Sequence, residues 1–101
     1  MMWNNNSAKM EKSIINQKIH DECARICNLL IAKNEAYNNS LHVEPPLFPM
    51  DAETGIKARI NDKLNRIKTT GLSSDTEDTL DDLIGYLIHL NIAYKLKNQK
   101  V

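Results

Sequence analysis

The sequence is poor in the residues on which common catalytic and binding motifs depend. It holds three glycines and two cysteines in 101 residues, with no glycine-rich phosphate loop, nucleophilic serine motif or nucleic-acid-binding module. One tryptophan, three tyrosines and one phenylalanine are too few for a base-stacking platform. No apolar run approaches the roughly 20 residues that span a bilayer, and the polar amino terminus does not resemble a signal peptide. We therefore expect a cytoplasmic protein that does not enter a membrane.

The charges of the chain balance as a whole but not locally. Thirteen basic and thirteen acidic side chains cancel, which disfavours nucleic acid as a partner. Residues 57–68 nevertheless hold five bases and one acid, whereas residues 75–82 hold five acids and no base. The two cysteines, Cys23 and Cys27, lie one helical turn apart and are expected to be free thiols in a reducing compartment.

Apolar spacing and helix-ending residues predict an all-α fold, with no competing strand pattern. Asp51 is a suitable N-cap, Gly71 a suitable stop, and the prolines within residues 44–49 exclude a helix there. On the last helix we expect an apolar face. That face consists of Leu80, Leu83, Ile84, Leu87, Leu90 and Tyr94. The predicted segments are a flexible start (1–9), a helix (about 10–36), a long Pro-rich loop (37–50) and helices over about 51–69 and 74–97.

These segments form one predicted domain, 1–101, built as a three-helix bundle-like unit. A chain of this length buries only a small core when it folds alone. We therefore expect the bundle to be completed by association into a homo-oligomer.

The second and third predicted helices carry opposite charges on neighbouring faces. Arg59, Asp62, Lys63 and Arg66 follow a helical period on the second helix, and Glu77, Asp78, Asp81 and Asp82 crowd the start of the third. Basic side chains beside carboxylates can hold a phosphate together with Mg²⁺. The simpler interpretation is a set of exposed ion pairs worth about 0–1 kcal/mol each.

Three further patterns have a functional and a simpler interpretation. Asp78, Asp82, Gly85 and His89 lie along one line of the third helix, where they would form a polar seam facing a pocket. His20, Cys23 and Cys27 share a face and would need His42 or His89 to complete a zinc site, but cysteine on an apolar face is usually a small hydrophobe. Tyr37 and Phe48 flank the Pro-rich loop, where they would either sandwich a base or anchor the loop.

The order of three short motifs resembles the small helical family called nucleotide modification-associated domain, type 1, which is common in phages. The motifs are Lys33-Asn34-Glu35-Ala36-Tyr37-Asn38-Asn39-Ser40, Arg59-Ile60-Asn61-Asp62-Lys63-Leu64-Asn65-Arg66 and Glu77-Asp78-Thr79-Leu80-Asp81-Asp82-Leu83-Ile84-Gly85-Tyr86. A more distant similarity is to MazG-like all-helical nucleoside triphosphate pyrophosphatases, whose metal site joins an E-x-x-E helix to an E-x-x-D helix. The first predicted helix here has no E-x-x-E.

Together the charge pattern and the resemblance imply a protein that binds a phosphorylated nucleotide and, if it is phage-encoded, acts in the host cytoplasm. The expected ligand-binding residues are Lys33, Asn34, Tyr37, Ser40, Arg59, Lys63, Arg66 and Tyr86. Glu77, Asp78 and Asp82 are the expected magnesium ligands, and Asp62 or Asp82 would position water if the nucleotide is hydrolysed. The alternatives are a non-catalytic protein that sequesters a host-defence signalling nucleotide and a purely structural interaction protein.

Overall fold

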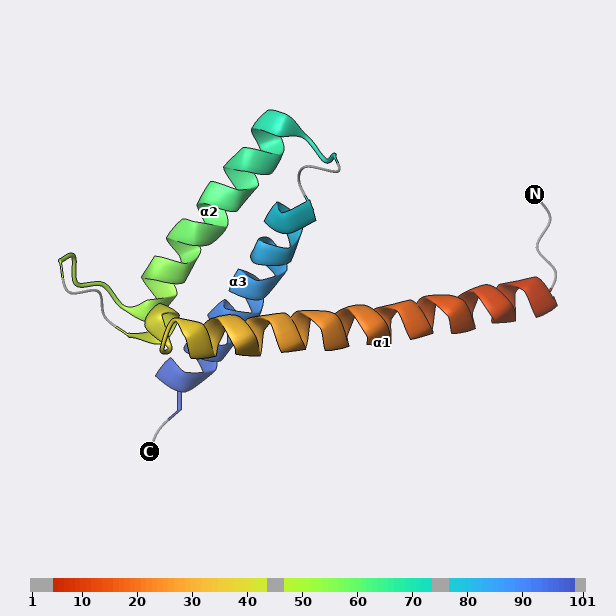
Figure 1. The fold of residues 1–101 in the computed structure, drawn as a ribbon, viewed down its shortest axis with the longest axis horizontal. Helices are drawn as coiled ribbons and strands as arrows, with labels where there is room; N and C mark the ends of the chain where they lie inside the picture. Colours follow the sequence, from red (N-terminus) through yellow and green to blue (C-terminus); the bar gives the residue numbers. More distant parts are fainter. Residues whose placement is uncertain (1–4, 44–46, 74–76, 100–101) are drawn as a thin grey trace. The chain divides into compact units, whose positions relative to one another are not determined.

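The computed structural model describes residues 5–43, 47–73 and 77–99, with side chains from residue 11 onward except that of Glu77. Its elements are α1 (Asn5–Ala36), a 3₁₀ turn η1 (Ser40–His42), α2 (Ala52–Thr70) and α3 (Glu77–Lys97) (Figure 1). No strand occurs in these ranges. The predicted all-α fold is confirmed. The chain divides into two compact units, one containing α1 as far as Lys33 and one beginning at Asn34.

The first unit is a single long helix. It begins at Asn5, about five residues before the predicted start, because residues 5–9 contain no glycine or proline and a formed helix extends readily into such a segment. Residues 11–25 are all exposed, and Ile14, Ile15 and Ile19 are each more than half exposed. Ile26 is buried. Most of the apolar stripe of α1 is therefore uncovered within this chain.

Helix α2 begins and ends where the sequence predicts. The backbone N–H of Thr54 donates to Asp51 Oδ1 at 2.8 Å, which makes Asp51 the N-cap. At the other end Gly71 has φ 71° and donates its N–H to the Ile67 carbonyl at 2.7 Å, a left-handed ending that glycine adopts without strain. The capping pattern predicted at Ser74 falls mostly outside the described residues.

The described residues between α1 and α2 are not α-helical, and hydrogen bonds order part of them. Asn38 and Asn39 both have positive φ angles. The Asn39 N–H donates to the Asn34 carbonyl at 3.2 Å, and the His42 N–H donates to the Asn39 carbonyl at 2.8 Å. Asparagine tolerates the left-handed conformation better than most residues. These bonds end α1 and lead directly into η1.

The second unit is centred on the antiparallel pair α2 and α3, with η1 against α2. Ile56 is fully buried, and the buried residues of α3 are small: Thr79, Gly85 and Ala93. Small side chains let two helices approach closely, so this face of α3 is the inward one. Four residues of the predicted apolar face of α3 are exposed in the structure. Leu80, Ile84, Leu87 and Tyr94 are 37%, 42%, 49% and 57% exposed.

None of the described helices is both long enough and apolar enough to cross a lipid bilayer.

Candidate functional site

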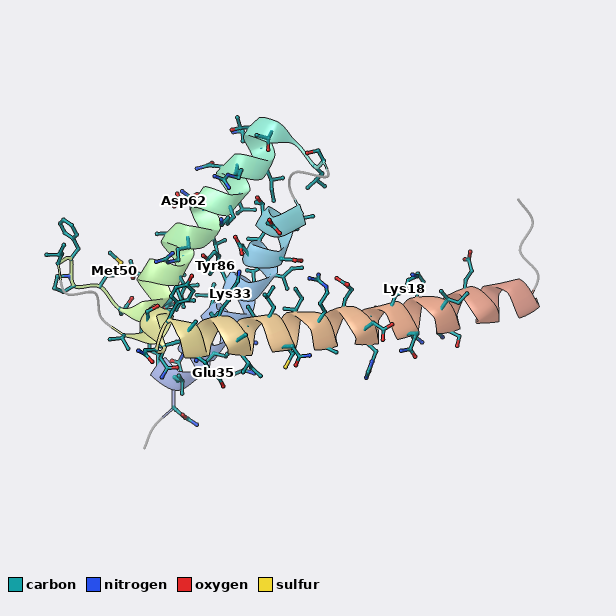
Figure 2. The ribbon with its side chains drawn as sticks, viewed as in Figure 1. Lys18, Lys33, Glu35, Met50, Asp62 and Tyr86 are labelled. Atoms are coloured by element: carbon teal, nitrogen blue, oxygen red, sulfur yellow. The ribbon has the colours of Figure 1, made fainter. Side chains whose placement is uncertain are left out.

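Residues of the second and third motifs contact each other at two places between α2 and α3. The Arg59 guanidinium lies 6.0 Å from the centre of the Tyr86 ring, and Lys63 Nζ lies 3.1 Å from Asp82 Oδ2. One turn forward on α2, from Arg59 to Lys63, corresponds to one turn back on α3, from Tyr86 to Asp82. This is the register of an antiparallel hairpin. Tyr86 lies at the border of the two helices (Figure 2).

The Lys63–Asp82 pair is half-buried. The two side chains are 21% and 26% exposed, so each charge has lost part of its hydration and depends on the other for compensation. The pair therefore differs from the exposed ion pairs of α1, such as Arg25–Glu22, whose side chains are 44% and 62% exposed. Asp82 positions the Lys63 ammonium on the outer edge of α2.

We call Arg59, Lys63 and Arg66 the basic row. Arg59 and Arg66 make no ion pair with any carboxylate in the part of the chain that the structure describes. The Arg59 contact with Tyr86 is at the limit of a cation–π interaction, and a guanidinium carries several N–H donors. Within the described residues, the row thus presents two guanidinium groups that form no ion pair, on either side of the Lys63 ammonium.

The expected acidic residues are dispersed along the hairpin. Asp62 lies on α2 (Figure 2) and Asp78 at the exposed start of α3, and neither forms an ion pair within the described ranges. The side chain of Glu77 lies outside those ranges. Among the described side chains no group of three or more His, Cys, Asp or Glu is arranged to hold a metal ion. The magnesium site stays a prediction.

The predicted polar seam of α3 contacts other elements. Asp82 pairs with Lys63 on α2, Gly85 is buried, and His89 Nδ1 lies 2.9 Å from His42 Nε2 on η1. The seam therefore fixes α3 to α2 and η1. Sequence analysis missed this histidine pair, because 47 residues separate its members and no local pattern connects them.

The surroundings of the histidine pair also change the acidity of His89. Burial, and then the neighbouring His42, lower the pKa of His89 from its usual 6.5. A hydrogen bond between two imidazoles needs one N–H donor and one neutral acceptor nitrogen. The pair is therefore formed when at least one ring is neutral.

The other candidates for the zinc site, the two thiols and His20, lie on α1. Cys23 and Cys27 are free and exposed, and His20 lies 3.7 Å from its neighbour Asp21 on α1. Since these residues belong to the first unit and the histidine pair to the second, the zinc set stays a prediction.

The first motif surrounds the end of α1. Lys33 is in the last turn of the helix, the Asn34 side-chain amide donates to Asn39 Oδ1, and the Ser40 N–H donates to the Tyr37 carbonyl at 3.1 Å. Asn34, Tyr37 and Ser40 make no hydrogen bond or ion pair to the basic row in the described structure. The structure therefore connects the second motif with the third.

The aromatic residues beside the Pro-rich loop do not anchor it. Tyr37 is 67% exposed and Phe48 is 75% exposed. The simpler interpretation of these residues, that they pack onto the bundle, is wrong. Both rings remain accessible to a ligand or a partner.

A second charged cluster joins the start of α2 to the end of α3. Lys97 Nζ lies 3.0 Å from Glu53 Oε2 and 3.9 Å from Asp51 Oδ2, and Lys57 lies 3.3 Å from Glu53. The hydrogen bond from Lys97, followed by that from Lys57, lowers the pKa of Glu53, while Glu53 raises the pKa of Lys97. Sequence analysis did not identify this cluster.

An open cavity of about 280 Å³ lies beside this cluster. Its lining consists of Glu53, Lys57, Leu87, Leu90, Asn91 and Tyr94. Ligand pockets usually measure about 300–1,000 Å³, so this one is at the lower limit and suits a single side chain better than a nucleotide.

The chain matches no known family profile, no curated protein and no solved structure. The resemblance to nucleotide modification-associated domains accordingly stays a prediction carried by the three motifs.

Proposed function

We propose that the α2–α3 hairpin binds a phosphorylated nucleotide at the basic row. The observation that carries the proposal is the placement of Arg59 and Arg66, which form no ion pair with the residues that the structure describes, one turn on either side of Lys63. A guanidinium fork binds phosphate oxygens with two parallel hydrogen bonds, and an ammonium adds a third cation. Three cations in line along one helix edge fit a chain of phosphates.

The choice of a nucleotide among anions rests on the motif resemblance. In this proposal Tyr86 supports Arg59, because the centre of its ring lies 6.0 Å from the Arg59 guanidinium. Tyr37 is accessible enough to stack on a base. Lys33, Asn34 and Ser40 belong to the same motif set and would contribute from the end of α1. The protein would act in the cytoplasm, in the host cell if it is phage-encoded.

Binding without hydrolysis is the form that the geometry supports better. Asp82 Oδ2 already accepts from Lys63 at 3.1 Å, so a magnesium ion at this oxygen would face a neighbouring ammonium. In our proposal Asp82 acts on the nucleotide indirectly, by positioning Lys63.

A thermal-shift screen with nucleoside mono-, di- and triphosphates, with and without magnesium, tests the proposal. A ligand at about 100 times its Kd adds about 2.7 kcal/mol of stability, which for a domain of this size raises Tm by more than about 10 °C. Chromatography of the mixtures then shows whether the nucleotide is intact. We expect a shift without magnesium and an intact nucleotide. Cleavage that requires magnesium would make the protein a hydrolase instead.

Two matched variants localise the binding. Arg59→Ala removes a guanidinium from the basic row and should abolish the shift. Lys68→Ala removes an exposed charge from the opposite side of α2 and should leave the shift unchanged. Equal losses in both variants would mean that only the general charge of α2 attracts the ligand, which would contradict the proposal.

A further inference from the structure

The open cavity between α2 and α3 combines apolar side chains with one cation, one carboxylate and one amide. Its apolar lining consists of Leu87, Leu90 and Tyr94 of α3, and its polar lining of Glu53 and Lys57 of α2 and Asn91 of α3. We call it the Lys57 cavity. All six residues belong to the compact unit that begins at Asn34, so the cavity does not depend on where α1 lies.

The Lys57 cavity and the basic row lie on different sides of α2. Successive residues of an α-helix are about 100° apart around its axis. Measured from the fully buried Ile56, Lys57 therefore lies about 100° to one side, whereas Arg59 lies about 60° to the other. A ligand in the cavity would not touch the basic row, so an inference about the cavity is independent of the nucleotide proposal.

The hydrogen-bonding capacity of the cavity lies with its cation. Both carboxylate oxygens of Glu53 already contact lysines, Oε1 at 3.3 Å from Lys57 Nζ and Oε2 at 3.0 Å from Lys97 Nζ. In the part of the chain that the structure describes, Glu53 is the only ion-pair partner of Lys57, whose side chain is 61% exposed. An ammonium carries three N–H donors, so Lys57 has donors left for a ligand.

The charges around the cavity favour a ligand with one negative charge. Glu53 and the two lysines that contact it sum to one positive charge, and the next carboxylate, Asp51, lies 3.9 Å from Lys97 and caps α2 with its other oxygen. A phosphate dianion at Lys57 would bring two negative charges beside the Glu53 carboxylate, which repels them. A carboxylate brings one.

We propose that the Lys57 cavity binds a small monocarboxylic acid with an apolar body. The carboxylate accepts hydrogen bonds from the Lys57 ammonium and the Asn91 amide, and the hydrocarbon part covers the apolar lining. Leu87 and Tyr94 are 49% and 57% exposed, so contact with a hydrocarbon removes apolar surface from water. The volume of about 280 Å³ is just below the roughly 300–1,000 Å³ of pockets for drug-sized ligands, which suits a short-chain or single-ring acid.

Heteronuclear NMR titration of the full chain with hexanoate, hexanamide and hexylammonium tests the ligand class. These probes have similar chains and differ in the charge of the head group. We expect saturable shift changes at the residues that line the cavity with hexanoate, and a Kd at least tenfold higher for hexanamide and for hexylammonium, because hydrogen bonds to a charged group are the stronger ones. Equal Kd values for acid and amide, tighter binding of the amine, or no saturable change with hexanoate would each overturn the proposal.

Two lysine variants locate the carboxylate. Lys57→Met should raise the Kd for hexanoate at least tenfold and stay helical by circular dichroism, because Glu53 keeps its contact with Lys97 at 3.0 Å. Lys68→Met is the matched control, since Lys68 is exposed on the same side of α2, about three turns further along and outside the cavity lining. It should bind hexanoate like the parent protein. An unchanged Kd in Lys57→Met, or equal increases in both variants, would contradict the assignment of Lys57.

Discussion

Replacing Lys63 by methionine and Asp82 by asparagine, singly and together, measures how strongly the half-buried pair holds α2 to α3. The two charged atoms lie 3.1 Å apart and their side chains are 21% and 26% exposed. Exposed pairs are worth about 0.2–1 kcal/mol, whereas breaking a fully buried pair costs about 3–5 kcal/mol. We therefore expect a coupling energy of about 1–2 kcal/mol between these two residues. The double variant should lose less stability than the sum of the losses in the two single variants.

Urea unfolding followed by far-ultraviolet circular dichroism gives the four free energies of the cycle. The matched control is Arg25–Glu22, an exposed pair on α1 at 2.8 Å, for which we expect about 0.2–0.5 kcal/mol. A coupling for Lys63–Asp82 no larger than that of Arg25–Glu22 would refute the reasoning from burial.

The same cycle separates the two roles considered for Asp82. If Asp82 positions Lys63, millimolar magnesium leaves the coupling energy nearly unchanged. If Asp82 binds the metal, magnesium competes with Lys63, and the coupling falls in the parent protein while Asp82→Asn becomes insensitive to the ion. A magnesium-dependent coupling would therefore favour hydrolysis over simple binding.

Three further predictions concern stability. Ile56 is fully buried, so Ile56→Val should cost about 0.5–1.5 kcal/mol and Ile56→Ala about 2–5 kcal/mol in urea unfolding; an Ile56→Ala loss under 1 kcal/mol would contradict its central place. Gly55→Ala should stabilise α2 by about 0.5–1 kcal/mol in the same assay, since the added carbon meets Met50 Sδ at 3.4 Å, an ordinary contact. The lowered pKa of His89 predicts stability that is present above pH 6.5 and lost as pH falls toward the folded-state value, because the unfolded chain takes up the proton first. His89→Gln should flatten that dependence, and an unchanged profile would contradict it.

Local signals in the sequence predicted the boundaries of the fold well. Asp51 and Gly71 end α2 because capping and a left-handed ending depend on residues within one turn. The start of α1 was predicted less well, because residues 5–9 contain no helix breaker and offer several possible N-caps, Asn5, Asn6 and Ser7, none of which stands out. The described residues of segment 37–50 are not α-helical, as predicted, but the 3₁₀ turn among them depends on the backbone of asparagines, which composition does not reveal.

The most apolar face of α3 is not the face that is buried, and there is a physical reason for this. Apolar periodicity identifies the most hydrophobic stripe of a helix, and on α3 that stripe includes Leu80, Ile84 and Leu87. The α2-facing side uses small residues such as Gly85 and Ala93 instead, because close approach of the helices leaves no room for leucine. A second apolar face is thus available for another surface.

Some contacts of the candidate site could be predicted from the sequence and others could not. The α2 and α3 motifs are brought together, because a short hairpin fixes the register that pairs Lys63 with Asp82. The His42–His89 and Glu53–Lys97 contacts join residues far apart in the sequence, for which no local pattern exists. Contacts of this kind can be identified only from the three-dimensional structure.

The most direct test of nucleotide binding at the basic row is a titration of isotope-labelled protein with a nucleoside triphosphate, followed by heteronuclear NMR without magnesium. The account predicts that the largest shift changes fall on residues 59–66 of α2 and on Tyr86, and that Arg59→Ala removes them while Lys68→Ala does not. Shift changes confined to other parts of the chain, or none at saturating nucleotide, would contradict it.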